Sequence, residues 1–99
     1  MSATANSYFH RGGDTPLLGA TIGEHFASIV KQCPHNEAVV SLPQGRRLTY
    51  AQFANAVNPL VRGLLAIGCN KGDRIGMWAP NNVEWLLLQI ATAQNVAVL

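Results

Sequence analysis

The residues most suggestive of chemistry follow a short apolar run near the C-terminal end of the chain. Residues 71–85 read KGDRIGMWAPNNVEW, and Pro80-Asn81-Asn82 separates the apolar run from an amphipathic stretch. If the run is a parallel strand, this corner lies at its carboxyl end and at a helix N-terminus, where open α/β sheets bind ligands. Two explanations are open: helix capping by Asn81 with Glu84, or a second role near a substrate pocket. Capping is favoured, because proline lacks a backbone N–H that a binding corner would use.

A second candidate is the segment Gly68-Cys69-Asn70-Lys71-Gly72-Asp73, which has the glycines and the lysine of a phosphate-binding loop. A phosphate loop runs from a strand into a helix, so that the free N–H groups of the helix face the anion. Here the glycines follow a helical pattern and precede a strand pattern. We therefore expect Gly68 to end a helix and Gly72-Asp73 to form a turn.

Other chemically active residue types are scattered along the chain. Two cysteines without CxxC spacing indicate reduced thiols in an intracellular protein, and Cys33-Pro34-His35 lacks the further ligands that zinc needs. The histidines are isolated, with no nucleophile elbow and no paired carboxylates nearby. No catalytic, cofactor-binding or metal-binding residue is predicted, and the residues considered are Cys33, Cys69, His10, His25 and His35.

Charge and hydropathy narrow the range of partners. The net charge is +2, and the basic residues are dispersed except for Arg46-Arg47, which is expected to be a solvated strand end, so no nucleic acid partner is predicted. No apolar stretch approaches the roughly 20 residues of a membrane-spanning helix. The chain is 48% hydrophobic and only 12% charged, which predicts apolar faces meant to be covered by protein and self-association where they are not. Trp78 and Trp85 are expected in the core.

Three helix starts share the spacing of a capping box, namely Thr21 with Glu24, Thr49 with Gln52 and Asn81 with Glu84. The first helix is predicted to end before Pro34 and the second at Gly68, with a kink where Pro59 interrupts the pattern. The apolar face of the first is Ile22, Phe26, Ile29, Val30 and Cys33. The apolar face of the second is Phe53, Val57, Leu60, Val61, Leu64 and Leu65.

Between and after these helices, β-type runs are predicted. Residues 37–42 and 46–50 form a hairpin around Pro43-Gln44-Gly45, and residues 74–79 form a strand buried on both faces. A third helix over 82–94 and a further strand beginning with VAVL complete the pattern. The fold class is α/β, with a β-hairpin, three helices and an incomplete parallel βαβ unit.

Two domain-level regions are expected, an extended arm over residues 1–20 and a partial domain over 21–99. Gly12-Gly13-Asp14-Thr15-Pro16 in the arm is turn-forming. The arm has no apolar core of the signal-peptide type, which leaves a cytoplasmic or a mitochondrial location open.

Several stretches of the sequence are characteristic of one family. LTYAQF (48–53), GLLAIGCNKGDRIGMWAPNNVEWLLLQIATAQ (63–94), TIGEHF and the pattern P..EAVV resemble the adenylate-forming (AMP-binding) acyl-CoA synthetase family. The lead-in SYFHRGGDTPLLGATIG is similar to that of the medium-chain fatty acyl-CoA ligases. The resemblance implies the N-terminal part of the large domain of such an enzyme.

The resemblance also implies an activity for the full-length enzyme. Members join a fatty acid to coenzyme A with ATP and Mg²⁺, through an acyl-adenylate and with release of pyrophosphate. The phosphate loop, the magnesium-binding glutamate, the ribose-binding aspartate and the lysine of the C-terminal lid are not found in this sequence, so no catalytic residue is carried over. Two departures stand out: Asn95-Val96 where relatives have Ala-Gly, and Pro59 where they have helix formers.

Three hypotheses of function follow. The leading one is a truncated piece of a fatty acid–CoA ligase, inactive alone and binding no cofactor itself. The alternative is a non-catalytic isoform or pseudoenzyme that acts as a protein-interaction module, through its uncovered sheet edge. A small nucleotide-binding α/β module is disfavoured by the missing glycine motif.

Overall fold

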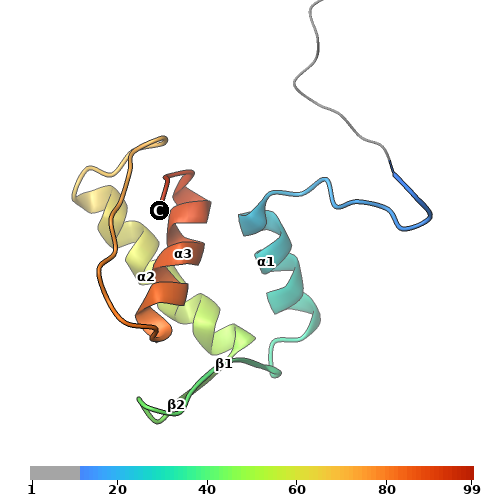
Figure 1. Ribbon diagram of the computed structural model, residues 1–99, viewed down its shortest axis with the longest axis horizontal. Coiled ribbons are helices and arrows are strands. Elements are labelled where there is room, and N and C mark those ends of the chain that lie inside the picture. The colour runs from blue at the N-terminus through green and yellow to red at the C-terminus, as the bar shows by residue number, and fades with distance from the viewer. Residues whose placement is uncertain (1–11) are drawn as a thin grey trace, which may run out of the picture.

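The computed structural model describes residues 12–99. The elements follow in the order α1 (Ile22–Gln32), β1 (Glu37–Ser41), β2 (Arg46–Thr49), α2 (Tyr50–Ala66) and α3 (Val83–Asn95). Figure 1 shows α2 and α3 side by side, with α1 next to them and the hairpin below the helices. The predicted three helices and hairpin are confirmed. None of the helices within residues 12–99 is long and apolar enough to cross a membrane.

The core lies between α2 and α3. Residues spaced by three or four positions on each helix turn toward the other, and burial of their apolar area is the main favourable contribution to folding. The predicted apolar face of α2 is therefore confirmed at its centre, although Leu65 at its edge is exposed. The buried apolar residues are Phe53, Val57, Leu64, Cys69, Val83, Leu87, Leu88 and Ala91.

Helix α1 is joined to this core at its edge. The ring of Phe26 meets that of Phe53 edge to face, with centroids 5.6 Å apart. No residue of α1 is fully buried, and Ile22 at the start of its predicted apolar face is 69% exposed. The prediction of a buried α1 face is thus only partly correct, because Phe26 is the residue of α1 that packs against the buried core.

Two of the three predicted capping boxes are confirmed. The Glu24 N–H donates to Thr21 Oγ1 (3.1 Å), and the Thr21 N–H donates to Glu24 Oε2 (3.2 Å). The same reciprocal pair joins Thr49 and Gln52 at α2. Helix α2 then continues through Pro59 and ends before Gly68, whose positive φ of 92° provides the predicted left-handed stop.

The hairpin has the predicted turn and a shorter second strand. Strands β1 and β2 pair antiparallel, with Ser41 opposite Arg46 and Val39 opposite Leu48. Gly45 in the turn has a φ of 63°, which glycine adopts without steric cost. Tyr50 was predicted to end the strand but begins α2, because Thr49 already serves as the helix cap.

The predicted strand over 74–79 is wrong beyond its first residues. Arg74 and Val98 form an isolated parallel bridge, in which the Ile75 N–H donates to the Val98 carbonyl (2.7 Å) and the Val98 N–H to that of Asp73 (2.8 Å). This contact begins the predicted parallel βαβ unit. Trp78, predicted to be in the core, is 103% exposed, since Val98 is the last residue that pairs with this segment in the described chain.

The chain turns out of α3 without the glycine that the family resemblance led us to expect at position 96. Val96 takes the left-handed conformation itself (φ 56°, ψ 31°) and caps α3, where a glycine would be free of strain. The turn out of the helix is therefore kept although the sequence lacks the glycine. Its cost is considered in the Discussion.

Candidate functional site

The Pro80-Asn81-Asn82 corner lies where the extended segment meets α3. Asn82 is the N-cap, in extended conformation, and its Oδ1 accepts from the Trp85 N–H (3.0 Å). The predicted capping box of Asn81 with Glu84 is wrong. The cap is the next residue, Asn82, and Glu84 does not bond back to it. The reason is that Glu84 is bonded to side chains of the hairpin, more than thirty residues earlier in the chain.

Three side chains tie the hairpin to the start of α3, and we call Gln44, Arg46 and Glu84 the hairpin clamp. The Val83 N–H donates to Gln44 Oε1 (3.0 Å), and Gln44 Nε2 donates to Glu84 Oε2 (3.0 Å). Arg46 Nη1 donates to Glu84 Oε1 (3.0 Å). Gln44 thus caps a helix from a distant turn, an interaction that no local spacing in the sequence indicates.

The clamp lowers the pKa of Glu84 from its ordinary value. The hydrogen bond from Gln44 is the largest cause, followed by the backbone N–H of Glu84 itself. Desolvation acts in the opposite direction, and Arg46 adds to the lowering by smaller amounts. The side chains of Glu84 and Arg46 are 50% and 38% exposed, so water screens their ion pair. The hydrogen bond from Gln44 is thus the main reason that Glu84 stays ionised to a lower pH than an ordinary glutamate.

These contacts occupy the N–H groups that an anion would need. A helix N-terminus binds phosphate through backbone N–H groups left free in its first turn. In α3 the N–H groups of Val83 and Trp85 already have side-chain partners, which are Gln44 and Asn82. The corner is therefore a closed helix cap, as the favoured of the two sequence explanations proposed.

A cleft of about 430 Å³ lies beside the corner, between β1, the hairpin turn and the first turn of α3. Its lining is mostly apolar and includes Val40, Leu86 and the exposed Asn81. None of the described residues that line it is ionisable. The cleft can accept an apolar group, but it offers no acid or base.

The glycine-rich segment after α2 is a turn, as predicted. The N–H groups of Gly68 and Cys69 donate to carbonyls in the last turn of α2, and Gly72 has a φ of 84°. Asp73 Oδ2 accepts from the Asn70 N–H (2.7 Å), so a carboxylate already occupies this donor. The segment presents the carbonyl end of a helix and is no phosphate cradle.

The thiols and imidazoles do not converge. Cys33 and Cys69 are free thiols, and Cys33 Sγ donates to the Ile29 carbonyl (3.3 Å). Residues 12–99 contain no group of three or more histidine, cysteine or acidic side chains that could hold a metal ion. His25 lies on α1 and His35 in the turn after it, while His10 lies outside the described residues.

The exposed arginines and tryptophans differ in how well they were predicted. Arg47 lies on the exposed strand as expected, but it pairs with Glu37 (2.9 Å), just as Arg46 pairs with Glu84. Trp85 is half-buried and donates its Nε1–H to the Ala79 carbonyl (2.9 Å), which confirms a packing role. This bond fixes the extended segment against α3 just before the corner.

With this geometry in view, comparisons with known proteins identify the family. Residues 26–99 match the family model described as AMP-binding enzyme. The chain belongs to the AMP-binding enzyme family. Its fold agrees, because a Mycobacterium tuberculosis fatty acyl CoA synthetase superposes with a TM-score of 0.75 and 33% identity, over 79% of this chain and 16% of that one. The N-terminal subdomain of Klebsiella oxytoca NpsA, 22% identical, shares the fold (TM-score 0.74, 79% of this chain and 20% of that one).

Curated relatives within the AMP-binding family are acyl-CoA ligases. The mouse mitochondrial medium-chain acyl-CoA ligase ACSF2 is 42% identical over 93 residues, which are 94% of this chain and 15% of the relative. The Bacillus subtilis putative acyl-CoA synthetase YngI is 40% identical over 83 residues, 84% of this chain and 15% of the relative. The chain thus spans about 15% of the length of these relatives. The match to the mouse ligase begins no later than Ser7, well before the family model.

Proposed function

We propose that this chain forms the opening part of the AMP-binding domain of a fatty acid–CoA ligase acting on medium-chain acids. The whole enzyme would convert fatty acid, ATP and CoA into acyl-CoA, AMP and pyrophosphate through an acyl-adenylate. The observation that carries the proposal is the family match over residues 26–99, together with similarity to a medium-chain ligase over almost the whole chain.

Within this proposal, residues 1–20 are a lead-in arm and residues 21–99 part of the domain. ATP, Mg²⁺ and CoA belong to the full-length ligase. The described residues do not fit a nucleotide: the N–H groups at the start of α3 are used within the chain, and the Gly68 turn follows a helix. We therefore assign no catalytic, cofactor-binding or metal-binding residue here. The chain contributes scaffold, is inactive alone, and is intracellular, in mitochondria or cytoplasm.

A chimera tests the proposal. Residues 26–99 of this chain would replace the matching segment of the mouse relative, and pyrophosphate release would be measured with octanoate, ATP and Mg²⁺. The chimera should retain activity, and the 99-residue chain alone should show none. A soluble, folded chimera without activity, or turnover by the isolated chain, would contradict the proposal.

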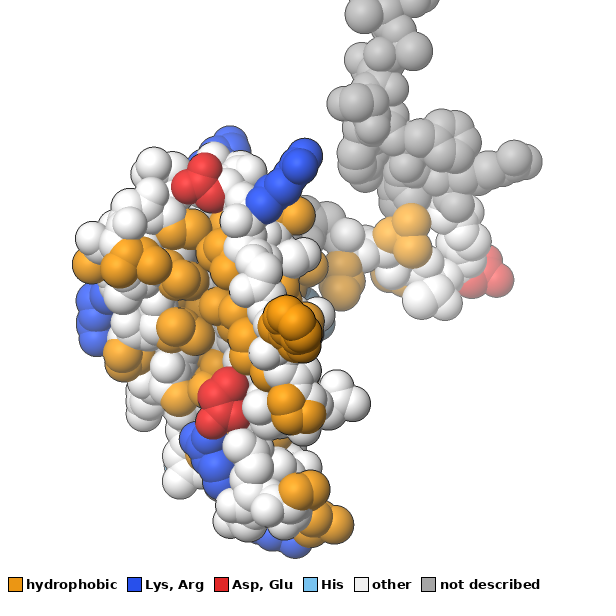
Figure 2. Space-filling model, turned by 60° about the vertical axis from the view of Figure 1, so that its left-hand side comes forward, with side chains coloured by type: hydrophobic (Ala, Val, Ile, Leu, Met, Phe, Trp, Pro, Cys, Tyr) orange, Lys and Arg blue, Asp and Glu red, His pale blue; other side chains and the backbone are white. Residues whose placement is uncertain are grey.

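A second candidate function, a protein-interaction module, is favoured by one feature of the surface. Trp78 is 103% exposed, and Val40, Leu42 and Leu86 around the cleft are also exposed. Figure 2 shows hydrophobic side chains spread over one face of the molecule. Because exposed apolar patches associate, the isolated chain should form oligomers, and Trp78→Ser should weaken them. Light scattering that shows a monomer at all concentrations would exclude this candidate.

A further inference from the structure

The extended segment before the Pro80 corner, residues 74–79, has the side-chain alternation of a β-strand, and we call it the edge segment. Ile75 and Met77 pack against the core, whereas Gly76 and Trp78 are exposed. Successive side chains of an extended chain point to opposite faces, so Gly76 and Trp78 share the outer face. In Figure 1 the edge segment is the orange trace at the left of the molecule. It thus presents one bare face to solvent.

The backbone of the edge segment is paired on one side only. The Ile75 N–H donates to the Val98 carbonyl, so the backbone groups of the odd-numbered residues point toward Val98. The groups of the even-numbered residues point away from it. None of Arg74, Gly76 and Trp78 has a backbone hydrogen bond to any described residue. An exposed edge with unpaired groups is a template for pairing with another extended chain.

A second copy of this chain supplies an extended segment that fits the edge. In an antiparallel pair, residues of a hydrogen-bonded pair exchange both of their N–H···O bonds. A register centred on Met77 places Gly76 of each copy opposite Trp78 of the other, which satisfies the free groups of both residues. The same register places Arg74 opposite Pro80, whose missing N–H ends the ladder. No two charges of the same sign then face each other.

The outer side chains are complementary in this register. Gly76 leaves a gap on the outer face, where an added Cβ would meet no atom within 4 Å. The Trp78 ring of the other copy can cover this gap, as aromatic side chains cover glycines at sheet edges. Trp78 is 103% exposed, and burial of the two rings removes about 300–500 Å² from water. A stable interface needs about 1,000 Å², so a weak dimer is expected.

We propose that the edge segment pairs antiparallel with that of a second copy, with Gly76 of each chain opposite Trp78 of the other. Such a dimer rests on the second candidate function, a protein-interaction module, for which it supplies the partner and the contact. Both copies use the same residues, so the interface closes on itself. Dimers are therefore expected in place of longer assemblies.

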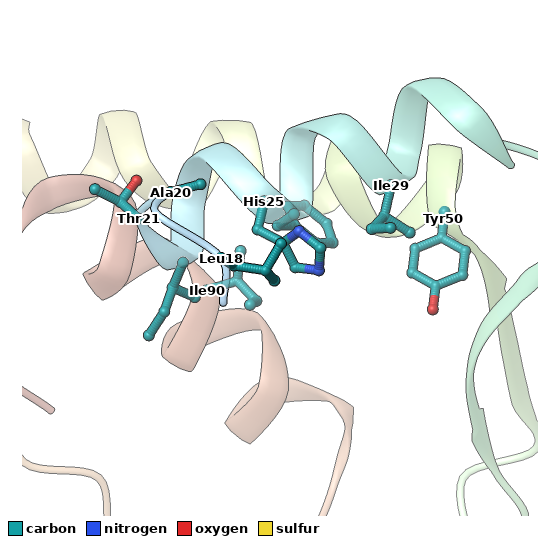
Figure 3. Close-up of a pocket in the computed structure, with 9 residues that line it drawn as sticks. Leu18, Ala20, Thr21, His25, Ile29, Tyr50 and Ile90 are labelled. Atoms are coloured by element: carbon teal, nitrogen blue, oxygen red, sulfur yellow. The ribbon is translucent and has the colours of Figure 1, made fainter. Parts of the chain in front are cut away.

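Another apolar surface of the chain provides the control. An open groove of about 400 Å³ lies beside α1, and its lining includes Leu18, Ile29 and Tyr50. Figure 3 shows side chains of α1, α2 and α3 around this groove. Leu18 is 72% exposed, so Leu18→Ser removes an exposed apolar side chain, as Trp78→Ser does, but from a mainly helical surface. The pair of variants separates pairing at the edge segment from association through any exposed apolar residue.

Sedimentation equilibrium of the 99-residue chain tests the proposal. Trp78→Ser should raise the dissociation constant of the dimer by about tenfold or more, because buried tryptophans dominate interfaces. Gly76→Pro removes the donor N–H and should weaken the dimer at least as much, whereas Gly76→Ala keeps this N–H and should still dimerise. Leu18→Ser should match wild type. Circular dichroism checks that each variant is folded.

NMR of the wild-type chain locates the contact without any substitution. Exchange of the Gly76 and Trp78 amide protons should slow as the chain concentration rises, and that of Met77 should not change, since its N–H points toward the other edge. In a mixture of labelled and unlabelled chains, nuclear Overhauser contacts should join Gly76 α-protons of one chain to the Trp78 ring of another.

Three results would overturn the proposed contact. Dimers that lack the contact between Gly76 and Trp78 would do so and leave the interaction module standing. Dimers lost in Leu18→Ser but kept in Trp78→Ser would place the contact at the groove beside α1. A chain that stays monomeric would overturn both the contact and the module. The ligase proposal is tested separately by the activity of the chimera.

Discussion

The two ends of α3 are terminated in different ways. At the N-terminal end, Asn82 and the distant Gln44 satisfy the backbone N–H groups with good geometry. At the C-terminal end, the backbone of Val96 is left-handed, and Asn95 Nδ2 is buried without a hydrogen-bond partner among the described residues. One end is stabilised by side chains, and the other is held in a costly conformation by its surroundings.

The constraint at the C-terminal end comes from the parallel contact. The Gly72 N–H donates to the Val96 carbonyl (2.9 Å), and the Ala97 N–H donates to the Thr92 carbonyl in the last turn of α3 (2.9 Å). Together these two hydrogen bonds require the chain to reverse direction immediately after α3. A left-handed residue costs about 1–2 kcal/mol when it carries a Cβ. The comparison teaches that the fold tolerates a poor residue where backbone pairing on both sides determines its conformation.

The largest effect is expected at the N-terminal end. Asn82→Ala removes the acceptor for the Trp85 N–H and should lower the free energy of unfolding by about 0.5–2 kcal/mol. The matched control is Asn81→Ala, an adjacent exposed residue that is not the cap. Urea unfolding in which Asn81→Ala costs as much as Asn82→Ala would place the cap at the wrong residue.

Gln44→Ala should have the next largest effect. It leaves the Val83 N–H without its acceptor and removes a donor to Glu84, so a loss of about 0.5–1.5 kcal/mol is expected. Gln44→Glu keeps the acceptor for Val83 but places a like charge beside Glu84, so it separates the two roles. If Gln44→Ala leaves the denaturation midpoint unchanged, the hairpin does not cap α3.

The C-terminal end should respond in the opposite direction. Val96→Gly removes the strain of the left-handed residue at some cost in chain entropy, and should raise stability by about 0.5–1 kcal/mol. Val96→Ala, which keeps the Cβ, is the control and should gain less. A loss of stability in the glycine variant, measured by thermal unfolding, would show that Val96 is not strained.

The smallest effect concerns acid. Because the folded pKa of Glu84 lies below its ordinary value of 4.5, its stabilisation is present above that value and is lost as pH falls through the lowered pKa. The difference in melting temperature between wild type and Glu84→Gln should therefore shrink in acid. Arg46→Met should leave most of this pH dependence intact, since Gln44 is the larger cause. A difference that grows in acid would have the wrong sign.

The sequence predicted those features whose causes are local. Capping boxes join residues three apart, and helix stops need one glycine, so Thr21, Thr49 and Gly68 were placed correctly. The hairpin clamp joins residues about forty apart, and its geometry arises only when the hairpin packs on α3. The exposure of Trp78 was missed for a similar reason: an apolar run does not reveal whether a neighbouring strand covers it.

The departure at Asn95-Val96 lies between these cases. The sequence showed that the helix-ending glycine is missing, but it did not show whether the turn would survive. The turn survives because pairing of residues 72–75 with 96–98 contributes more than the local preference of valine. The candidate site was also predicted only in part. The sequence located a helix start after Pro80, but it assigned the cap to Asn81 instead of Asn82.

The claim at the centre of this account is that the amino end of α3 is closed by the protein's own side chains. Titration of the ¹⁵N-labelled chain with inorganic pyrophosphate, followed through the amides of Val83 and Trp85, tests it most directly. These two resonances should not move, since Gln44 and Asn82 occupy their N–H groups. A saturable shift of both, with the rest of the spectrum unchanged, would show an anion site and contradict the account.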